Sequence, residues 1–164
     1  MVDLPALQTL RFHTIDLSLH ADTAVEFRRD SYVCSFGTDQ ALADTDGYLD
    51  WLRRRIAKVP DGHVRVWYGH SIVGQMEMII QHGETPHGYV NLFYLVPRVR
   101  GCGLGDALHN YAQNFMRGGG ARLVRLCVSP SNMRALAYYR KHGWRDQGPN
   151  PKDGSVHIMQ LDLY

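Results

Sequence analysis

The most informative segment of this chain reads Val96-Pro97-Arg98-Val99-Arg100-Gly101-Cys102-Gly103-Leu104-Gly105. It joins a largely apolar run, predicted as a buried strand over residues 89–96, to the start of a predicted helix. The first N–H groups of a helix have no partner within it, and the helix dipole adds partial positive charge there. Glycines also let the backbone approach a ligand closely. The turn therefore predicts a phosphate-binding loop, to which Arg98 and Arg100 would add positive charge.

Two common nucleotide-binding loops fit this turn poorly. A Walker A loop needs Gly-Lys-Ser/Thr after its spacer, and this sequence is absent. A dinucleotide fingerprint that starts at Gly101 would need a third glycine where Asp106 stands, and no acidic residue follows about 20 residues later to hold a ribose. A nucleotide-binding oxidoreductase is therefore a weak interpretation.

The patterns on both sides of the turn predict one α/β domain over residues 1–164 with a mixed sheet. Before the turn we expect an edge strand at 10–17, a helix from the capping box at Thr23–Glu26 to about residue 35, a second helix from about 45 to the Pro60-Asp61-Gly62 stop, and a hairpin of strands 64–68 and 72–80. After it we expect a helix at 104–116, a strand at 122–128, a helix from Asn132 to about 142, and strands at 144–147 and 156–163 around a turn at Asp153-Gly154.

Composition excludes several classes of protein. The 164 residues carry a net charge of only +2 and no long basic tract, which argues against a nucleic-acid partner. Three cysteines without a CxxC pair favour a reducing compartment. Met1–Pro5 lacks a secretory pattern and no apolar run would span a bilayer, so we expect a cytoplasmic protein without a membrane partner. The nine histidines are scattered, so no metal site is predicted.

Two motifs in this chain resemble those of the GNAT family of acetyltransferases. The acetyl-CoA loop of that family reads Arg/Gln-x-x-Gly-x-Gly/Ala, and residues 100–105 fit it. Family members often carry Asn-x-x-Ala-x-x-x-Tyr-x-x-x-Gly-Phe on the next helix, and residues 132–144 match it except that Trp144 replaces phenylalanine. The order and separation of the two motifs also agree, and the detailed resemblance covers residues 89–144.

The resemblance implies a mostly antiparallel mixed sheet flanked by about four helices, with acetyl-CoA as cosubstrate. The glycines of the loop would hold the pyrophosphate, residues 93–96 would pair with pantetheine, and an N–H near Leu95 would polarise the thioester. Tyr139 would protonate the leaving sulfur as general acid. The implied cosubstrate-binding residues are Leu95, Val96, Arg98, Arg100, Gly101, Cys102, Gly103, Leu104, Gly105, Asn132 and Tyr139.

The base that deprotonates the amine is less well defined by the sequence. The family often uses a glutamate on the central strand, but residues 89–96 contain no carboxylate, and Asn91 is the strand's one candidate polar side chain besides tyrosines. Glu77 on the preceding strand is the best substitute. It is either a partly buried carboxylate with a raised pKa or a solvated residue on the outer face. A third alternative is that water carries the proton away.

We therefore expect an N-acetyltransferase in which a primary amine attacks acetyl-CoA directly. The acceptor is an amino acid, a polyamine, an aminoglycoside-type antibiotic or a protein amino group. Arg28, Arg29 and Tyr32 on the first helix would favour an acceptor that carries a carboxylate. The rival interpretation is a non-catalytic acyl-CoA-binding or regulatory module that has lost its base. Dimers are common in the resembled family, which makes a homodimer a candidate assembly.

Overall fold

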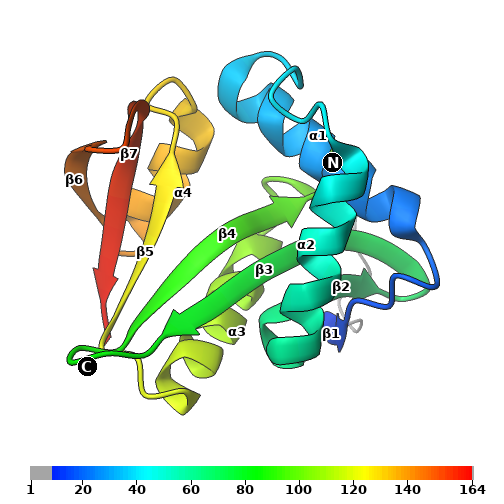
Figure 1. Cartoon of the computed structure of the whole chain (residues 1–164), viewed down its shortest axis with the longest axis horizontal. Coiled ribbons are helices and arrows are strands. Elements are labelled where there is room, and N and C mark those ends of the chain that lie inside the picture. Colours follow the sequence, from blue (N-terminus) through cyan, green and yellow to red (C-terminus); the bar gives the residue numbers. More distant parts are fainter. Residues whose placement is uncertain (1–8, 164) are drawn as a thin grey trace.

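A seven-stranded sheet forms the centre of the structure, a computed structural model that describes residues 9–163 (Figure 1). Met1–Pro5, where no secretory pattern was found, lies outside the described residues. Each pair of neighbouring strands is antiparallel except the central pair, β4 and β5, which is parallel. In sheet order the strands are β1 (Arg11–Thr14), β2 (His63–Tyr68), β3 (Ser71–Gln81), β4 (His87–Leu95), β5 (Leu123–Val128), β7 (Asp153–Asp162) and β6 (Arg145–Asn150).

Four α-helices cover the two faces of this sheet. They are α1 (Ala21–Phe36), α2 (Thr45–Lys58), α3 (Leu104–Gly118) and α4 (Met133–Lys141). Figure 1 shows α1 and α2 in front of the sheet and α3 behind it. Buried residues of α3 and α4 share the largest apolar core, whereas α1 and α2 contribute to separate, smaller clusters. The predicted fold class is therefore confirmed.

The two faces of β2 and β3 have different chemistry. Val64 and Met76, a cross-strand pair, enter the apolar core on the α3 side. His63 and Glu77, the neighbouring pair, point to the opposite face because successive side chains of a strand alternate. On that face Glu77 is completely buried and contacts polar side chains of α1 and α2. The region beneath α1 and α2 is therefore polar as well as buried.

The predicted capping box at Thr23–Glu26 is wrong. Helix α1 begins at Ala21, after His20 in the left-handed conformation with φ of 61°, and no side chain caps it. Arg65 on β2 donates hydrogen bonds to the carbonyl oxygens of Leu19 and His20. A long-range contact therefore holds the residues that lead into this helix, whose first N–H groups have no side-chain cap.

The predicted turn at Asp153-Gly154 is also displaced. In the structure Asn150 pairs with Asp153, so the turn of the last hairpin falls at residues 151–152 and Gly154 belongs to β7. The side chain of Asn150 accepts a hydrogen bond from the N–H of Lys152 at 2.9 Å. This local bond to asparagine defines the turn in place of the Asp-Gly pair.

The outer strand β6 closes one edge of the sheet. It carries Arg145, Asp146 and Pro149, and its pairing with β7 is irregular. Charges, proline and irregular pairing are common devices that protect an edge strand from joining another chain.

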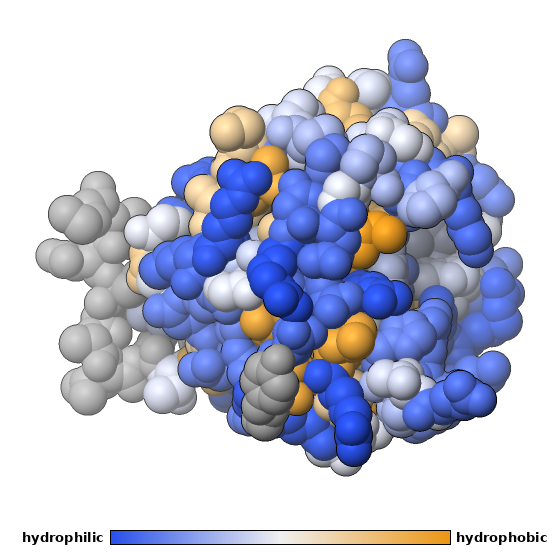
Figure 2. Space-filling model, turned by 90° about the vertical axis from the view of Figure 1, so that its left-hand side faces the viewer, coloured by the Kyte–Doolittle hydropathy of each residue, from blue (hydrophilic) through white to orange (hydrophobic). Residues whose placement is uncertain are grey.

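The side of the molecule seen in Figure 2 is mainly hydrophilic, with separate apolar spots and no continuous apolar band.

A buried histidine links α3 to the segment after α4. The imidazole of His109, 4% exposed, accepts a hydrogen bond from the indole N–H of Trp144 at 3.0 Å. Burial, with a smaller contribution from the nearby His142, lowers the pKa of His109 to about 4. The folded protein therefore keeps this side chain neutral well below the pH at which a free histidine takes up a proton.

We expect His109 to make the protein less stable as the pH falls from about 6.5 to about 4. Over that range the unfolded chain binds a proton that the folded chain excludes, so the free energy of unfolding decreases, by up to roughly 3 kcal/mol at the lower end. His109→Gln keeps an acceptor for Trp144 but does not titrate. Urea unfolding of both proteins between pH 7.5 and pH 4.5 should show a shallower pH dependence in the variant, and an unchanged slope would contradict this assignment.

Candidate active site

The parallel strands β4 and β5 pair over only part of their length. Their register runs from His87 opposite Leu123 to Val90 opposite Leu126. The pairing of β4 with β3 also shifts at this point, where Asn91 is inserted as an extra residue between Val90 and Leu92. Beyond it the two strands separate, as Figure 1 shows, and line a cavity of about 470 Å³. A β-bulge thus coincides with the opening of a cleft in the middle of the sheet.

The wall of the cleft on the β4 side presents free backbone groups. The N–H of Val96 donates to the carbonyl of Val73 on β3 at 2.8 Å. Because hydrogen-bonded and non-bonded positions alternate along an antiparallel pair, the amide groups of Phe93 and Leu95 face away from β3 and into the cleft. Arg100 donates a hydrogen bond to the carbonyl oxygen of Leu95 at 2.8 Å. An extended ligand can pair with the groups that are left.

The glycine turn lies at one end of this cleft. Gly101 and Gly103 line the cavity in left-handed conformations, with φ of 74° and 82°. Gly105 serves another purpose, because a Cβ atom there would lie 2.6 Å from the ring of Tyr138 on α4. The hydroxyl of Tyr138 donates to the carbonyl of Gly105 at 2.6 Å. The absence of a side chain at Gly105 therefore lets α3 and α4 meet closely.

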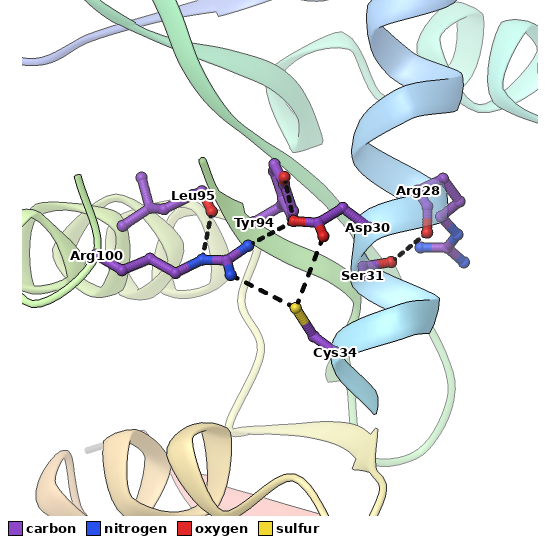
Figure 3. A network of polar contacts seen from close by, with 7 residues as sticks. All are labelled: Arg28, Asp30, Ser31, Cys34, Tyr94, Leu95 and Arg100. Carbon is purple, nitrogen blue, oxygen red and sulfur yellow. Dashed lines mark hydrogen bonds and ion pairs between the residues drawn. The ribbon is translucent and has the colours of Figure 1, made fainter. Parts of the chain in front are cut away.

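Arg100 is bonded to other parts of the protein (Figure 3). Its guanidinium lies 2.8 Å from a carboxylate oxygen of Asp30 on α1, and the same oxygen accepts a hydrogen bond from Tyr94 at 2.6 Å. Arg100 also lies 3.5 Å from the sulfur of Cys34. The guanidinium thus connects the glycine turn to α1 and to the end of β4, and it shapes the loop.

Helix α4 forms the opposite wall of the cleft. Asn132 caps it, with its side-chain oxygen 3.2 Å from the N–H of Ala135. Tyr139 lies seven residues after this cap, on the same face of the helix. It lines the cavity, although its side chain is largely buried. Burial raises the pKa of Tyr139, so the phenol keeps its proton at neutral pH. The aromatic rings of Phe93 and Trp144 lie near it, at 6.4 and 5.5 Å between centroids.

The structure brings together most of the predicted cosubstrate-binding residues. Those that line the cavity are Leu95, Arg100, Gly101, Gly103, Gly105, Asn132 and Tyr139. Outside its lining are Val96 and Leu104, which pack against the apolar core, and Arg98 and Cys102, which are exposed.

Two basic residues of the cleft escaped the sequence analysis. Arg134 and Lys141 on α4 line the cavity, and Arg134 reaches the glycine turn, 3.9 Å from where a Cβ atom on Gly101 would lie. Their spacing of seven residues places both on one helical face, together with Tyr138. This signal was present in the sequence once the helix had been assigned. Arg134 thus adds positive charge beside the turn together with Arg100, whereas Arg98, the other arginine expected there, lies outside the lining.

Glu77 lies beneath the cleft and does not line it. Its side chain is fully buried, so the alternative of a solvated residue on the outer face is wrong. The hydroxyl of Tyr48 donates to one carboxylate oxygen at 2.8 Å, and Arg28 lies 3.5 Å from the other. Burial raises the pKa of Glu77, while Arg28 and Tyr48 oppose this effect. The carboxylate is thus held among partners that stabilise its charged form.

A second cavity, of about 600 Å³, adjoins the first. Arg28 and Tyr32 on α1 line it, as do residues of the last hairpin such as Asp153. Arg29, the other arginine expected near an acceptor, instead pairs with Asp39 at the surface, at 3.2 Å. The two cavities share the lining residues Ser31, Ser35, Asn91 and Cys127. Two ligands could therefore meet where β4 and β5 separate.

The described part of the chain was also searched for metal sites and membrane segments. Residues 9–163 contain no group of three or more His, Cys, Asp or Glu side chains that could hold a metal ion. Among the helices of these residues, none combines the length and the apolar character that a bilayer crossing requires.

Comparisons with known proteins agree with this geometry. A model of the acetyltransferase (GNAT) family matches residues 23–144. The PaiA N-acetyltransferase from Thermoplasma acidophilum, solved with coenzyme A, is 18% identical, with a TM-score of 0.75 over 94% of this chain and 99% of that one. The spermidine N-acetyltransferase from Vibrio cholerae, solved with CoA and spermine, is 14% identical, with a TM-score of 0.72 over 94% and 95%. A chain of the NatC complex bound to Gag peptide and CoA is 15% identical, with a TM-score of 0.71 over 94% and 99%.

The contact between Gly105 and Tyr138 predicts that Gly105→Ala destabilises the protein. The new methyl group would collide with a ring that its own hydroxyl bond holds in place, at a cost of about 1–2 kcal/mol even though alanine favours helices. Gly154→Ala is the matched control, because it meets no atom within 4 Å and should change the free energy of unfolding by less than about 0.5 kcal/mol. Urea denaturation measures both, and equal stabilities would contradict the proposed packing role.

Proposed function

The chain belongs to the GNAT acetyltransferase family, and on this premise we propose that it transfers an acetyl group from acetyl-CoA to a primary amine. The cleft between β4 and β5 carries the proposal, because it has a glycine turn at one end, Tyr139 on its wall and a second cavity beside it. Acetyl-CoA enters through the first cavity and the amine through the second. The two meet near Asn91, which both cavities share.

The residues of the first cavity suit acetyl-CoA. The N–H groups of the glycine turn and of the first turn of α3 bind the pyrophosphate. Arg134 and Lys141 add positive charge from α4. Asp106, a carboxylate in the same region, is turned to the imidazole of His142 at 2.8 Å. The free backbone groups of Phe93 pair with the pantetheine arm. We retain Val96, Arg98, Cys102 and Leu104 as secondary candidates, through their backbone or their proximity to the turn.

Acetyl-CoA supplies an acetyl group activated as a thioester. The N–H of Leu95 donates to the carbonyl oxygen of that group, where negative charge develops as the amine nitrogen bonds to the acetyl carbon. Tyr139 donates its proton to the sulfur as the carbon–sulfur bond breaks. Burial raises the pKa of Tyr139, so the phenol keeps its proton until the sulfur leaves.

Glu77 is our candidate for the final acceptor of the proton that leaves the amine. It is held next to Arg28, which lines the second cavity, and burial raises its pKa, which favours proton uptake. Because Glu77 lines neither cavity, the proton would reach it through water. The alternative is that solvent takes the proton directly and Glu77 only balances the charge of Arg28.

The class of amine is the open part of this proposal. An amino acid, a polyamine, an aminoglycoside-type antibiotic and a protein amino group are all candidates, and the solved relatives include one bound to spermine and one bound to a peptide. The absence of a carboxylate on β4 supports the rival function, a non-catalytic acyl-CoA-binding module. Titration with acetyl-CoA by calorimetry, followed by thiol-release assays over a panel of amines, separates the two.

For the cellular setting we propose the cytoplasm. Cys34, Cys102 and Cys127 are all free thiols, which favours the reducing cytoplasm. A homodimer, and the absence of nucleic-acid and membrane partners, stay predictions.

We expect Tyr139→Phe to lower kcat about a hundredfold or more while acetyl-CoA affinity changes little. The variant keeps the ring that packs in the cleft and removes the acidic proton. Tyr111→Phe is the control, since its hydroxyl bonds to the carbonyl of Asp61. Thiol release and calorimetry measure the two effects. An unaltered kcat would exclude Tyr139 as the acid.

We expect Glu77→Gln to lower kcat and to change its pH dependence. Without the carboxylate the rate should rise with pH until the amine itself is neutral, and at neutral pH it should be about 10²-fold lower. Tyr48→Phe removes a hydrogen bond to Glu77 but keeps the carboxylate, so it controls for disruption of the buried cluster. If both variants show the same pH profile as the original protein, solvent is the proton acceptor.

A further inference from the structure

Asn91 occupies the point where the central strands separate. It is the extra residue of the bulge in β4, directly after the last pair between β4 and β5. It is also one of the few residues that line both cavities. Its position therefore corresponds to the place where the proposed acetyl donor and acceptor come together.

The side chain of Asn91 has an unused hydrogen-bond acceptor. Its Oδ1 atom is buried, and no residue of the described chain donates to it. The backbone carbonyl of the same residue is satisfied, because Arg28 donates to it at 3.0 Å. Leaving a buried polar atom without a partner is costly, and native proteins seldom do so except where a ligand or water completes the bond.

The shared lining residues around Asn91 offer less to a ligand. Ser31 donates its hydroxyl proton to the carbonyl of Arg28 at 2.7 Å. The sulfur of Cys127 accepts a hydrogen bond from the side chain of Asn150 at 3.3 Å. Both groups are thus engaged with the protein. Among the shared lining residues that the structure describes, the carboxamide of Asn91 carries the buried side-chain atom that has no hydrogen-bond partner.

The N–H group that would bond to Oδ1 of Asn91 fits the amine substrate better than it fits acetyl-CoA. The free backbone groups of Phe93 and the N–H of Leu95 face acetyl-CoA further along β4. Asn91 precedes that surface and borders the second cavity, where the amine enters. An amine that approaches the acetyl group from this cavity passes the carboxamide.

We propose that Oδ1 of Asn91 accepts a hydrogen bond from the attacking primary amine and orients its lone pair towards the acetyl carbon. This inference rests on the proposed function. A neutral primary amine has two N–H groups, so it can donate one to Asn91 while its lone pair remains free. A carboxamide oxygen does not hold a proton at neutral pH. Asn91 therefore binds and orients the amine, and the proton leaves by another path.

The test compares Asn91→Ala and Asn91→Asp with Asn110→Ala, an exposed asparagine on α3. Steady-state thiol release gives KM for the best amine and kcat, and calorimetry gives the Kd of acetyl-CoA. We expect Asn91→Ala to raise the KM for the amine about tenfold and to leave the Kd of acetyl-CoA within about twofold. Asn91→Asp retains an acceptor oxygen beside Arg28 and should keep a KM close to the original value. Asn110→Ala should match the original protein.

The pH profile provides a second readout. Asn91→Ala should leave the acidic limb of kcat/KM in place, because Asn91 carries no proton, whereas Asn91→Asp adds a titrating group and should shift that limb. An unchanged KM in Asn91→Ala would overturn the inference. So would an equal loss of acetyl-CoA affinity, which would assign Oδ1 to pantetheine, or an equal rise of KM in both substitutions at position 91.

Failure of the proposed function would look different. In that case the original protein would release no thiol with any amine, although acetyl-CoA still bound, and the inference would fall with it. Activity in the original protein together with a normal KM in Asn91→Ala would overturn the inference alone.

Discussion

The separation of two parallel strands in the middle of the sheet is the constraint on which the rest of the molecule depends. Backbone groups in the interior of a protein need partners, and β4 and β5 stop supplying them to each other after Val90 and Leu126. The bulge at Asn91 coincides with this change, and β4 pairs with β3 on both sides of it. What remains is a polar-walled cleft with the shape and the hydrogen-bonding groups for an extended ligand.

Contacts between residues that are distant in sequence hold the end of the cleft at which the glycine turn lies. Arg100 connects the glycine turn to Asp30 on α1, and Gly105 lets Tyr138 of α4 lie against the start of α3. The turn therefore does more than present N–H groups, because it also fixes the spacing of three helices around the cleft. In such a motif, some glycines are required for packing and others for the close approach of a ligand.

The buried polar face beneath α1 and α2 is the less usual feature of this fold. An isolated buried carboxylate would be strongly disfavoured, so Glu77 persists because Tyr48 and Arg28 are in contact with it. Arg28 in turn bonds to the carbonyl of Asn91, at the boundary of both cavities. A single arginine thus joins a fully buried charge to the bulge in β4, which couples the electrostatics of the interior to the cleft.

Much of this protein was determined by local sequence. Periodicity placed the helices and strands, and two motifs identified the glycine turn, Asn132 and Tyr139, because the spacing of residues on one helix or turn is dictated by backbone geometry. Tertiary structure alone decided what required long-range contacts: the bonds from Arg65 to the residues before α1, the pairing of Arg100 with Asp30, the burial of Glu77, and the meeting of two cavities at Asn91. Such features depend on which strands lie side by side and where their pairing ends, and a residue pattern along one chain segment does not contain that information.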